Sequence, residues 1–247
     1  MTVTSEQPGQ RQYPMTGHAQ TLKNIFRAVS EASCPYVYNF HMHTVCSDGK
    51  LTPSELMQQA VDIGLRAFAI TDHHTLEGYY QARSWFEDWQ WRNPRSCRPQ
   101  KASELGQPSS PRLFPGVEIT ASMAGTEVHI LGYGFAPHHE AIQPYLKRGA
   151  PRGQAMAARS VVQSIQTAGG LAVLAHPARY KLSAELLVPE AATLGFDGVE
   201  AYYAYGNPKQ WQPCPQQTPK VKTLAAQHQL LTTCGTDTHG QSLLRRI

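Results

Sequence analysis

No apolar stretch of this 247-residue chain approaches the length of a membrane span, and residues 1–20 lack the apolar core of a secretory signal. The five cysteines contain no CxxC pair and are odd in number, which favours free thiols in a reduced compartment over a disulfide framework. Internal repeats are also absent. We therefore expect a cytoplasmic protein that contacts no membrane.

Lysine and arginine side chains are few and scattered along the chain. The net charge is only +4, from 22 Lys and Arg against 18 Asp and Glu. A nucleic-acid-binding surface would need these basic residues to cluster, and the sequence shows no such cluster. This mild excess is compatible with a small anionic substrate. The 41% of hydrophobic residues is enough for one sizeable core, and the length suits a single α/β barrel.

Short apolar runs alternate with helical patterns along most of the chain. A strand at residues 36–40 is followed by a helix at 53–63, with Thr52 as N-cap and Pro53 at its first position, and then by a strand at 67–71. This strand–helix–strand order predicts parallel pairing. Further strands are expected at 113–118, 127–134, 171–175, 196–201 and 230–235, and further helices at 20–32, 77–91, 139–147, 153–168, 183–194 and 218–228.

The seven predicted strands, with helices between most of them, indicate an α/β barrel. Residues 1–19, rich in Gln, Pro, Gly and Thr, are expected to be disordered, and residues 20–247 to form a single barrel domain. A Pro-, Ser- and Arg-rich stretch at 92–112 predicts a mobile loop. The aromatic helix at 77–91 is expected to pack against the barrel, with a base-stacking surface as the alternative.

His41 and His43 are the most informative residues, because they stand where an apolar strand ends. Side chains alternate along a strand, so two histidines one residue apart can point the same way and hold a divalent metal. Similar residues follow or interrupt the other apolar runs, and the candidate ligands are His41, His43, Asp48, His73, Glu118, His129, His176, Asp237 and His239. Since C-terminal strand ends meet at one mouth of an α/β barrel, we predict a polynuclear metal site there.

The composition of this ligand set indicates the metal and the reaction. Six imidazoles with three carboxylates suit Mn, Fe or Zn, whereas Mg and Ca prefer oxygen ligands alone. Nine ligands exceed what one ion uses, so two or three divalent ions are expected. Metals about 3.5–4 Å apart can stabilise both the attacking and the leaving oxygen of a phosphoryl displacement. Phosphate-ester hydrolysis is therefore favoured, with amide hydrolysis as the competitor.

Six ordered motifs carry a resemblance to a known family. They are HMHTVCSDG at 41–49, TDHHT at 71–75, GVEIT at 116–120, EVHILGYGF at 127–135, AHPARY at 175–180 and GTDTHG at 235–240. The sequence resembles the polymerase-and-histidinol-phosphatase (PHP) superfamily of metal-dependent phosphoesterases, and within it the branch that acts on nucleotide or RNA 5′-end phosphoesters. The resemblance covers roughly residues 36–240. It implies a distorted seven-stranded barrel with a trinuclear metal centre.

The resemblance also implies roles for individual residues. His41, His43, Glu118 and Asp237 would hold the first ion, with Glu118 bridging; His129 and His176 would complete the second; Asp48, His73 and His239 would hold the third. Asp72 would orient a ligand from outside the metal shell. Glu118, Asp237 and Arg179 are the residues expected to act in catalysis.

Two features depart from the family pattern. His74 stands where relatives often have Asp and is expected to line the substrate site. The segment near 136–155 is a shortened insertion, without room for the helical subdomain that many relatives place over the active site. Arg179 can hold a phosphate through two hydrogen bonds and Lys181 offers a point charge, so both are candidate substrate-binding residues beside His74.

The favoured substrate, by resemblance, is a nucleotide such as a 3′,5′-bisphosphate or the 5′ end of a short RNA, with DNA ends also open, hydrolysed by a metal-activated hydroxide. The alternatives are a histidinol-phosphate-type phosphomonoesterase, a broader exonuclease, and a non-catalytic, metal-stabilised scaffold or regulatory module. The complete ligand set argues against the scaffold. The sequence indicates no obligate protein partner.

Overall fold

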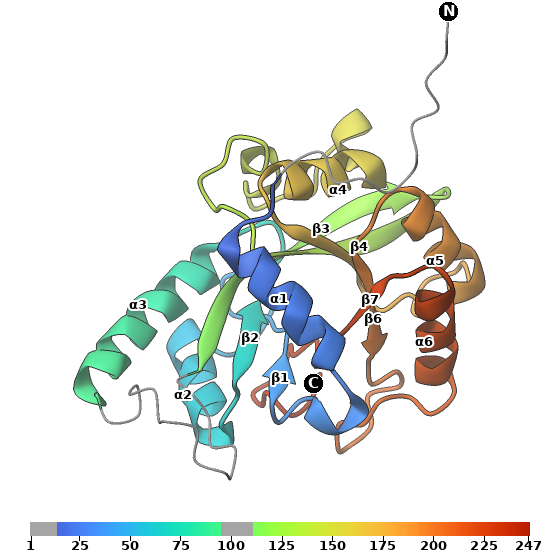
Figure 1. Cartoon of the computed structure of the whole chain (residues 1–247). Coiled ribbons are helices and arrows are strands. Elements are labelled where there is room, and N and C mark those ends of the chain that lie inside the picture. The colour runs from blue at the N-terminus through green and yellow to red at the C-terminus, as the bar shows by residue number, and fades with distance from the viewer. Residues whose placement is uncertain (1–13, 95–110) are drawn as a thin grey trace, which may run out of the picture.

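The computed structural model describes residues 14–94 and 111–247, whose strands form one seven-stranded sheet that curves into a nearly closed barrel (Figure 1). The strands β1 to β7 comprise Tyr38–Asn39, Ala67–Ile70, Arg112–Met123, Thr126–Tyr133, Leu171–Leu174, Gly198–Tyr202 and Leu231–Cys234, and neighbours in the chain are neighbours in the sheet. Backbone hydrogen bonds from Phe40 N to Cys234 O (3.0 Å) and from Asp237 N to His41 O (2.7 Å) join the ends of β1 and β7. The predicted α/β barrel is confirmed.

Helices surround these strands. The α-helices of the described residues are α1 (Gly17–Ala28), α2 (Pro53–Ile63), α3 (Glu77–Arg92), α4 (Ala158–Thr167), α5 (Ala184–Thr193) and α6 (Gln217–Gln227), and the 3₁₀ helices are η1 (Glu31–Ser33), η2 (Gln143–Tyr145) and η3 (Gly153–Met156). In Figure 1, α2 and α3 flank β2, α4 lies along β3 and β4, and α5 and α6 occupy the opposite side. Ala19 of α1 lies against Gly134, just after β4, so α1 covers the end of the barrel away from His41 and His43.

Helix α2 shows how local sequence sets the boundaries of an element. The Thr52 hydroxyl accepts from Glu55 N, and the Glu55 carboxylate accepts from Thr52 N, a capping arrangement worth about 1 kcal/mol. Gly64 ends the helix in a left-handed conformation (φ 84°) that glycine adopts without strain. Leu56 and Met57 are fully buried in the same apolar cluster as β2. This packing fixes the strand that leads to His73.

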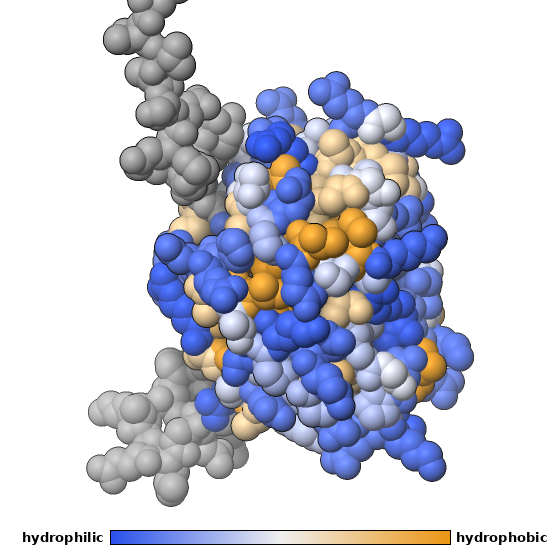
Figure 2. Space-filling model, turned by 90° about the vertical axis from the view of Figure 1, so that its right-hand side faces the viewer, coloured by the Kyte–Doolittle hydropathy of each residue, from blue (hydrophilic) through white to orange (hydrophobic). Residues whose placement is uncertain are grey.

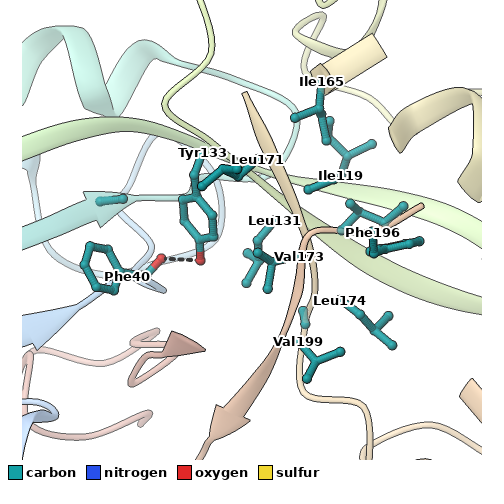
Figure 3. Close-up of a cluster of buried hydrophobic side chains, with 14 of the residues drawn as sticks. Phe40, Ile119, Leu131, Tyr133, Ile165, Leu171, Val173, Leu174, Phe196 and Val199 are labelled. Atoms are coloured by element: carbon teal, nitrogen blue, oxygen red, sulfur yellow. Dashed lines mark hydrogen bonds between the residues drawn. The ribbon is translucent and has the colours of Figure 1, made fainter. Parts of the chain in front are cut away.

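The core beneath the barrel mouth is built from apolar side chains of several strands (Figure 3). Leu131 and Val173 lie next to each other there and are fully buried. The Tyr133 hydroxyl donates to Phe40 O over 2.8 Å, and Phe26 of α1 packs edge-on against the Phe40 ring with centroids 5.0 Å apart. Burial of each such side chain contributes about 1.5–3 kcal/mol. This packing fixes the position of β1, which His41 and His43 follow, relative to β4, which contains His129.

The β3–β4 pair departs from the expected parallel order. Ala124 and Gly125 take left-handed conformations (φ 51° and 75°), which form the two-residue turn of a tight antiparallel hairpin. β4 consequently runs antiparallel to both β3 and β5, whereas the other neighbouring strands pair in parallel. His129 therefore reaches the barrel mouth from within a strand and not from a C-terminal strand end.

Several predicted boundaries also differ from the structure. The helix expected at 139–147 is wrong: only the 3₁₀ turn η2 forms, and Pro144 within it has no backbone N–H to donate to an α-helical hydrogen bond. The helix expected at 153–168 begins five residues later, after the left-handed Gly153 (φ 58°). α1 begins at Gly17, inside the predicted disordered segment, because the Thr16 hydroxyl caps it by accepting from Ala19 N. Residues 1–13 of that segment and 95–110 of the predicted loop lie outside the described residues.

The surface on the side of α5 and α6 is mainly hydrophilic, with apolar patches near its centre (Figure 2). The aromatic helix α3 buries Tyr79 and Phe86 against its neighbours, while Trp91 near its end is 83% exposed. Packing thus accounts for part of the aromatic character of α3. Within residues 14–94 and 111–247, no helix combines the length and the apolar composition that crossing a bilayer requires.

Replacement of Gly235 by alanine is expected to destabilise the protein. A Cβ at this position would lie 2.2 Å from His41 Cβ and 2.7 Å from His41 N, so the ends of β1 and β7 would have to separate. A loss of about 1–3 kcal/mol, as for other overpacked cores, should lower the midpoint of denaturant unfolding. Gly17→Ala is the control, because its added carbon meets no atom within 4 Å. Equal stability of the two variants would contradict this expectation.

Candidate metal centre

All nine predicted ligands lie together at the mouth of the barrel. His41 and His43 follow β1, His73 follows β2, His176 follows β5, Asp237 and His239 follow β7, Glu118 and His129 lie within the β3–β4 hairpin, and Asp48 lies in the loop after β1. Their ligating atoms form overlapping groups within 4.8 Å, namely His43-Asp48-His73-His239, His41-His43-Glu118-Asp237 and His73-Glu118-His129, and His41 and His176 form a fourth group with Glu200, which is not one of the nine. We call the nine predicted ligands the histidine–carboxylate cluster.

Glu118 occupies the centre of the cluster and is buried. Its Oε2 lies 3.0 Å from Nε2 of both His41 and His43. Its Oε1 lies 2.8 Å from His129 Nδ1 and 3.5 Å from His176 Nε2. A carboxylate with imidazoles at both oxygens has the placement that a bridge between two ions requires.

Asp48 gathers a second set of histidines on the open side of the cluster. Its Oδ2 lies 3.1 Å from His239 Nε2 and 3.7 Å from His73 Nε2. Its Oδ1 lies 3.5 Å from His43 Nδ1. Because Asp48 is 52% exposed, this side of the cluster is the one that solvent reaches.

Asp72 supports two of the ligands through the loop that joins them. Its carboxylate accepts hydrogen bonds from Thr44 N, the Thr44 hydroxyl and the Ser47 hydroxyl, each at 2.7 Å. Thr44 and Ser47 flank the short loop between His43 and Asp48. Among the described residues, these hydrogen bonds join the Asp72 carboxylate to the loop and not to a ligand side chain, so Asp72 acts on the ligands by fixing their backbone.

The two oxygens of Asp237 have different surroundings. Oδ2 accepts hydrogen bonds from Tyr203 Oη (2.7 Å), Arg246 Nε (2.8 Å) and Arg179 Nη1 (2.9 Å). Oδ1 faces inward, 3.3 Å from His41 Nε2 and 3.2 Å from Nε2 of its neighbour His43. The donors on Oδ2 therefore orient the carboxylate so that Oδ1 points toward the imidazoles.

Several buried polar atoms of the cluster have no hydrogen-bond partner in the described part of the chain. They are both ring nitrogens of His43, Oε1 of Glu118 and Nδ1 of His176. An unsatisfied buried polar atom costs about 1–3 kcal/mol, so the cluster is incomplete with side chains alone. Imidazole nitrogens mixed with carboxylate oxygens are ligands of Mn, Fe and Zn. The residues present therefore fit divalent metal ions.

The same crowding shifts the pKa values of the metal-free side chains. Burial lowers the pKa of His43, but the adjacent carboxylates of Asp237 and Glu118 outweigh burial and raise it to about 9. Burial raises the pKa of Glu118, but the nearby His41 and His129 outweigh burial and hold it well below its usual range. At neutral pH the carboxylate is ionised and His43 carries a proton that a metal ion must displace.

A small cavity opens above the cluster, with a volume of about 120 Å³. It is lined by Asp48, His73, Glu118, His129, Arg179, Asp237, His239 and Arg246. Among the predicted substrate-binding residues, Arg179 is in this lining, but His74 and Lys181 are not. His74 is buried with Nε2 3.1 Å from the Thr120 hydroxyl, and Lys181 is exposed.

Three residues beside the cluster were not predicted from the sequence. Glu200 is buried and faces His41 Nδ1 at 3.0 Å, while Tyr203 and Arg246 contact Asp237. Glu200 did have a signal, since an acidic residue interrupts an otherwise apolar strand at 198–202. Arg246 had none, because its position depends on how the segment after β7 folds back on the barrel.

Comparisons with known proteins agree with this site. A family model for the PHP domain matches residues 39–145. The chain is 26% identical to the 5′-3′ exoribonuclease Rnm of Salmonella typhimurium, over 86% of this chain and 88% of the relative. It is 29% identical to a 3′,5′-nucleoside bisphosphate phosphatase of Chromobacterium violaceum, over 53% of this chain and 39% of that protein.

Solved structures show the same fold. A protein of Bifidobacterium adolescentis described as a metal-dependent phosphoesterase matches with a TM-score of 0.59 and 25% identity, over 83% of this chain and 88% of that one. An amidohydrolase of Chromobacterium violaceum matches with a TM-score of 0.62 and 20% identity, over 82% and 87% of the two chains. The second likeness concerns the fold alone.

A barrel that gathers histidines and carboxylates at one mouth, together with these relatives, defines a metal-dependent hydrolase. Residues 39–145 match the PHP domain, and the relatives and solved structures to which the chain is similar agree with the resemblance that its motifs predicted.

The metal-free protein is expected to lose stability between pH 7 and pH 9.5. The pKa of His43 is about 9 in the folded protein and about 6.5 in the unfolded chain. The stabilisation of the fold by protonated His43 is therefore fully present below pH 6.5 and is lost as the pH rises through 9. Thermal melting of chelator-treated protein measures this. The decrease should be smaller in His43→Gln and unchanged in His228→Gln, which alters an exposed histidine. The same slope in all three proteins would refute the assignment to His43.

Proposed function

We propose that this protein binds two or three divalent ions (Mn, Fe or Zn) through the histidine–carboxylate cluster and hydrolyses a phosphoester at the 5′ end of a short RNA or of a nucleotide such as a 3′,5′-bisphosphate. The names of two relatives support this substrate class. The exoribonuclease match spans most of both chains, whereas the bisphosphate phosphatase match spans about half of this one, so the RNA end is the favoured substrate.

The observation that carries this proposal is the small cavity between the cluster and two guanidinium groups. At about 120 Å³ it is well below the roughly 300 Å³ at which pockets begin to enclose a whole small molecule. Six of the eight residues that line it are metal-ligand candidates, so bound ions and a phosphoryl group would share this space, and a nucleoside would not fit inside it. A site of this kind acts at the end of a chain or on a mononucleotide, with little contact to the base.

Arg179 and Arg246 line this cavity and supply positive charge beside the cluster. Arg179 is 40% exposed and Arg246 is 18% exposed, so both remain open to a ligand that enters from solvent. Guanidinium groups form charge-assisted hydrogen bonds with the non-bridging oxygens of a phosphate. We assign them the binding and orientation of the phosphoryl group.

The remaining residues hold the reacting groups in place. When bound, divalent ions supply Lewis-acid activation of the phosphoryl group and of water. The chain contributes the imidazoles and carboxylates that hold such ions, with Glu118 between them. Tyr203 keeps Asp237 Oδ2 engaged, so that Oδ1 stays directed at the cluster.

Protein loaded with Mn²⁺ is expected to release mononucleotides from a short 5′-phosphorylated RNA and phosphate from a 3′,5′-bisphosphate nucleotide. Histidinol phosphate in the same panel tests the monoesterase alternative. Asp237→Asn should lower the rate by at least about 100-fold, because the amide no longer offers an anionic oxygen to the cluster. Full metal content without turnover of any of these substrates would remove the proposal and favour a scaffold.

Arg246→Lys is expected to lower kcat/KM for these substrates by about 10- to 100-fold. The reason is that lysine lacks the planar fork that can contact Asp237 and a phosphate together, a loss of about 1.5–3 kcal/mol for a charged hydrogen bond. The neighbouring Arg245→Lys is the matched control, since Arg245 is exposed and is not part of the cavity lining. If both variants had equal kcat/KM, Arg246 would have no role in substrate binding.

A further inference from the structure

Glu200, in the middle of β6, is a buried carboxylate that the nine-residue ligand set does not include. It is fully buried, and its ion-pair partner in the described part of the chain is His41. No lysine or arginine there forms an ion pair with it. An acidic group without a cationic partner is costly inside a barrel, so its place beside the cluster requires an explanation.

Both oxygens of Glu200 face the same ring nitrogen. Oε1 and Oε2 lie 3.0 and 3.1 Å from His41 Nδ1. Both carboxylate oxygens of Glu200 are placed to accept a hydrogen bond from Nδ1, so this geometry puts the proton of His41 on Nδ1 and leaves Nε2 to bind a metal. Nε2 indeed points into the cluster, 3.0 Å from Glu118 Oε2 and 3.3 Å from Asp237 Oδ1.

The same carboxylate also holds the backbone of a second ligand. Glu200 Oε2 accepts a hydrogen bond from His176 N at 2.9 Å. His176 has a φ of 25°, a strained conformation for a residue with a Cβ, and this bond helps to maintain it. The rings of His41 and His176 lie nearly parallel, with centroids 5.6 Å apart. One side chain on β6 thus fixes ligands that follow β1 and β5.

We propose that Glu200 is a positioning residue that sets the orientation of His41 and His176 for metal binding. Its carboxylate acts through His41 Nδ1 and His176 N, without contact to the substrate. The proposal rests on the metal centre proposed above and does not depend on which phosphoester is hydrolysed. Residues that orient metal ligands in this way change metal affinity by about 10- to 100-fold when they are replaced.

Glu200→Gln tests the proposal, because it keeps the size of the side chain and removes its charge. Metal-free protein is titrated with Zn²⁺ by calorimetry, and the ions bound at saturation are counted by elemental analysis. The expected result is an apparent Kd about 10- to 100-fold weaker, with the same number of ions at saturation. Glu127→Gln is the matched control, since it removes an exposed carboxylate from β4 and should leave the Kd unchanged.

A spectroscopic readout separates positioning from a merely structural role. In the Zn²⁺-loaded protein, the Nδ1–H resonance of His41 in spectra of ¹⁵N-histidine-labelled protein should shift in Glu200→Gln and stay in place in Glu127→Gln. Glu200→Asp, which retains the charge on a shorter side chain, should give a Kd between those of the wild type and Glu200→Gln. This variant also provides the measurement if Glu200→Gln does not fold.

Two results would overturn the proposal. One ion fewer at saturation would make Glu200 itself a ligand, and an unchanged Kd with an unchanged His41 resonance would make it a core residue without influence on the metal. These experiments measure metal binding and the His41 Nδ1–H resonance, and neither depends on the hydrolysis of a substrate. A failure to find hydrolysed substrate would therefore not be confused with a failure of this inference.

Discussion

The structure depends on one electrostatic constraint, which is that Glu118 is buried among imidazoles. In the described residues its ion-pair partners are histidines, with no lysine or arginine among them. Removal of a carboxylate from water costs several kcal/mol, and only positive charge close by offsets that cost. Histidines can provide it as protons or, after those protons leave, as ligands of metal cations. The cluster therefore has the composition that an exchange of protons for metal ions requires, and the ends of several strands are held together by the same charges.

Backbone strain occurs at the same place. His176 and Asp237 have positive φ angles of 25° and 53°, although both carry a Cβ. Such conformations cost about 1–3 kcal/mol each and persist only where other contacts impose them. His176 N is held by Glu200, and Asp237 N donates to His41 O across the seam of the barrel. The strained residues are thus tied to the remaining ligands by hydrogen bonds, which couples the shape of the barrel mouth to the geometry of the cluster.

The sequence predicted the barrel, and the nine candidate ligands lie together in the structure because most of them stand in or shortly after a short apolar strand. That relation is local and can be read from residues such as His41 and His176. Arg246 and Tyr203 were missed because their place beside Asp237 is set by long-range folding. The stretch at 139–147, expected to be a helix, is followed by Arg148, whose backbone N–H donates to His74 O, and nothing in the stretch itself indicates that contact. The spacing of apolar residues shows which face of one helix or strand is buried. A contact between two segments far apart in the chain cannot be inferred from the pattern of either segment alone.

The division between strands and loops separates the metal-ligand candidates from the two arginines that face the cavity. Metal-ligand candidates lie on or next to strands whose cores are packed, so their geometry follows from the fold. The two arginines that face the cavity come instead from the loop after β5 and from the segment after β7. Loops accept substitution more readily than packed strands, because fewer buried contacts depend on them. In the function proposed above, the reaction therefore follows from the barrel, and the choice of phosphoester follows from a few residues at its rim.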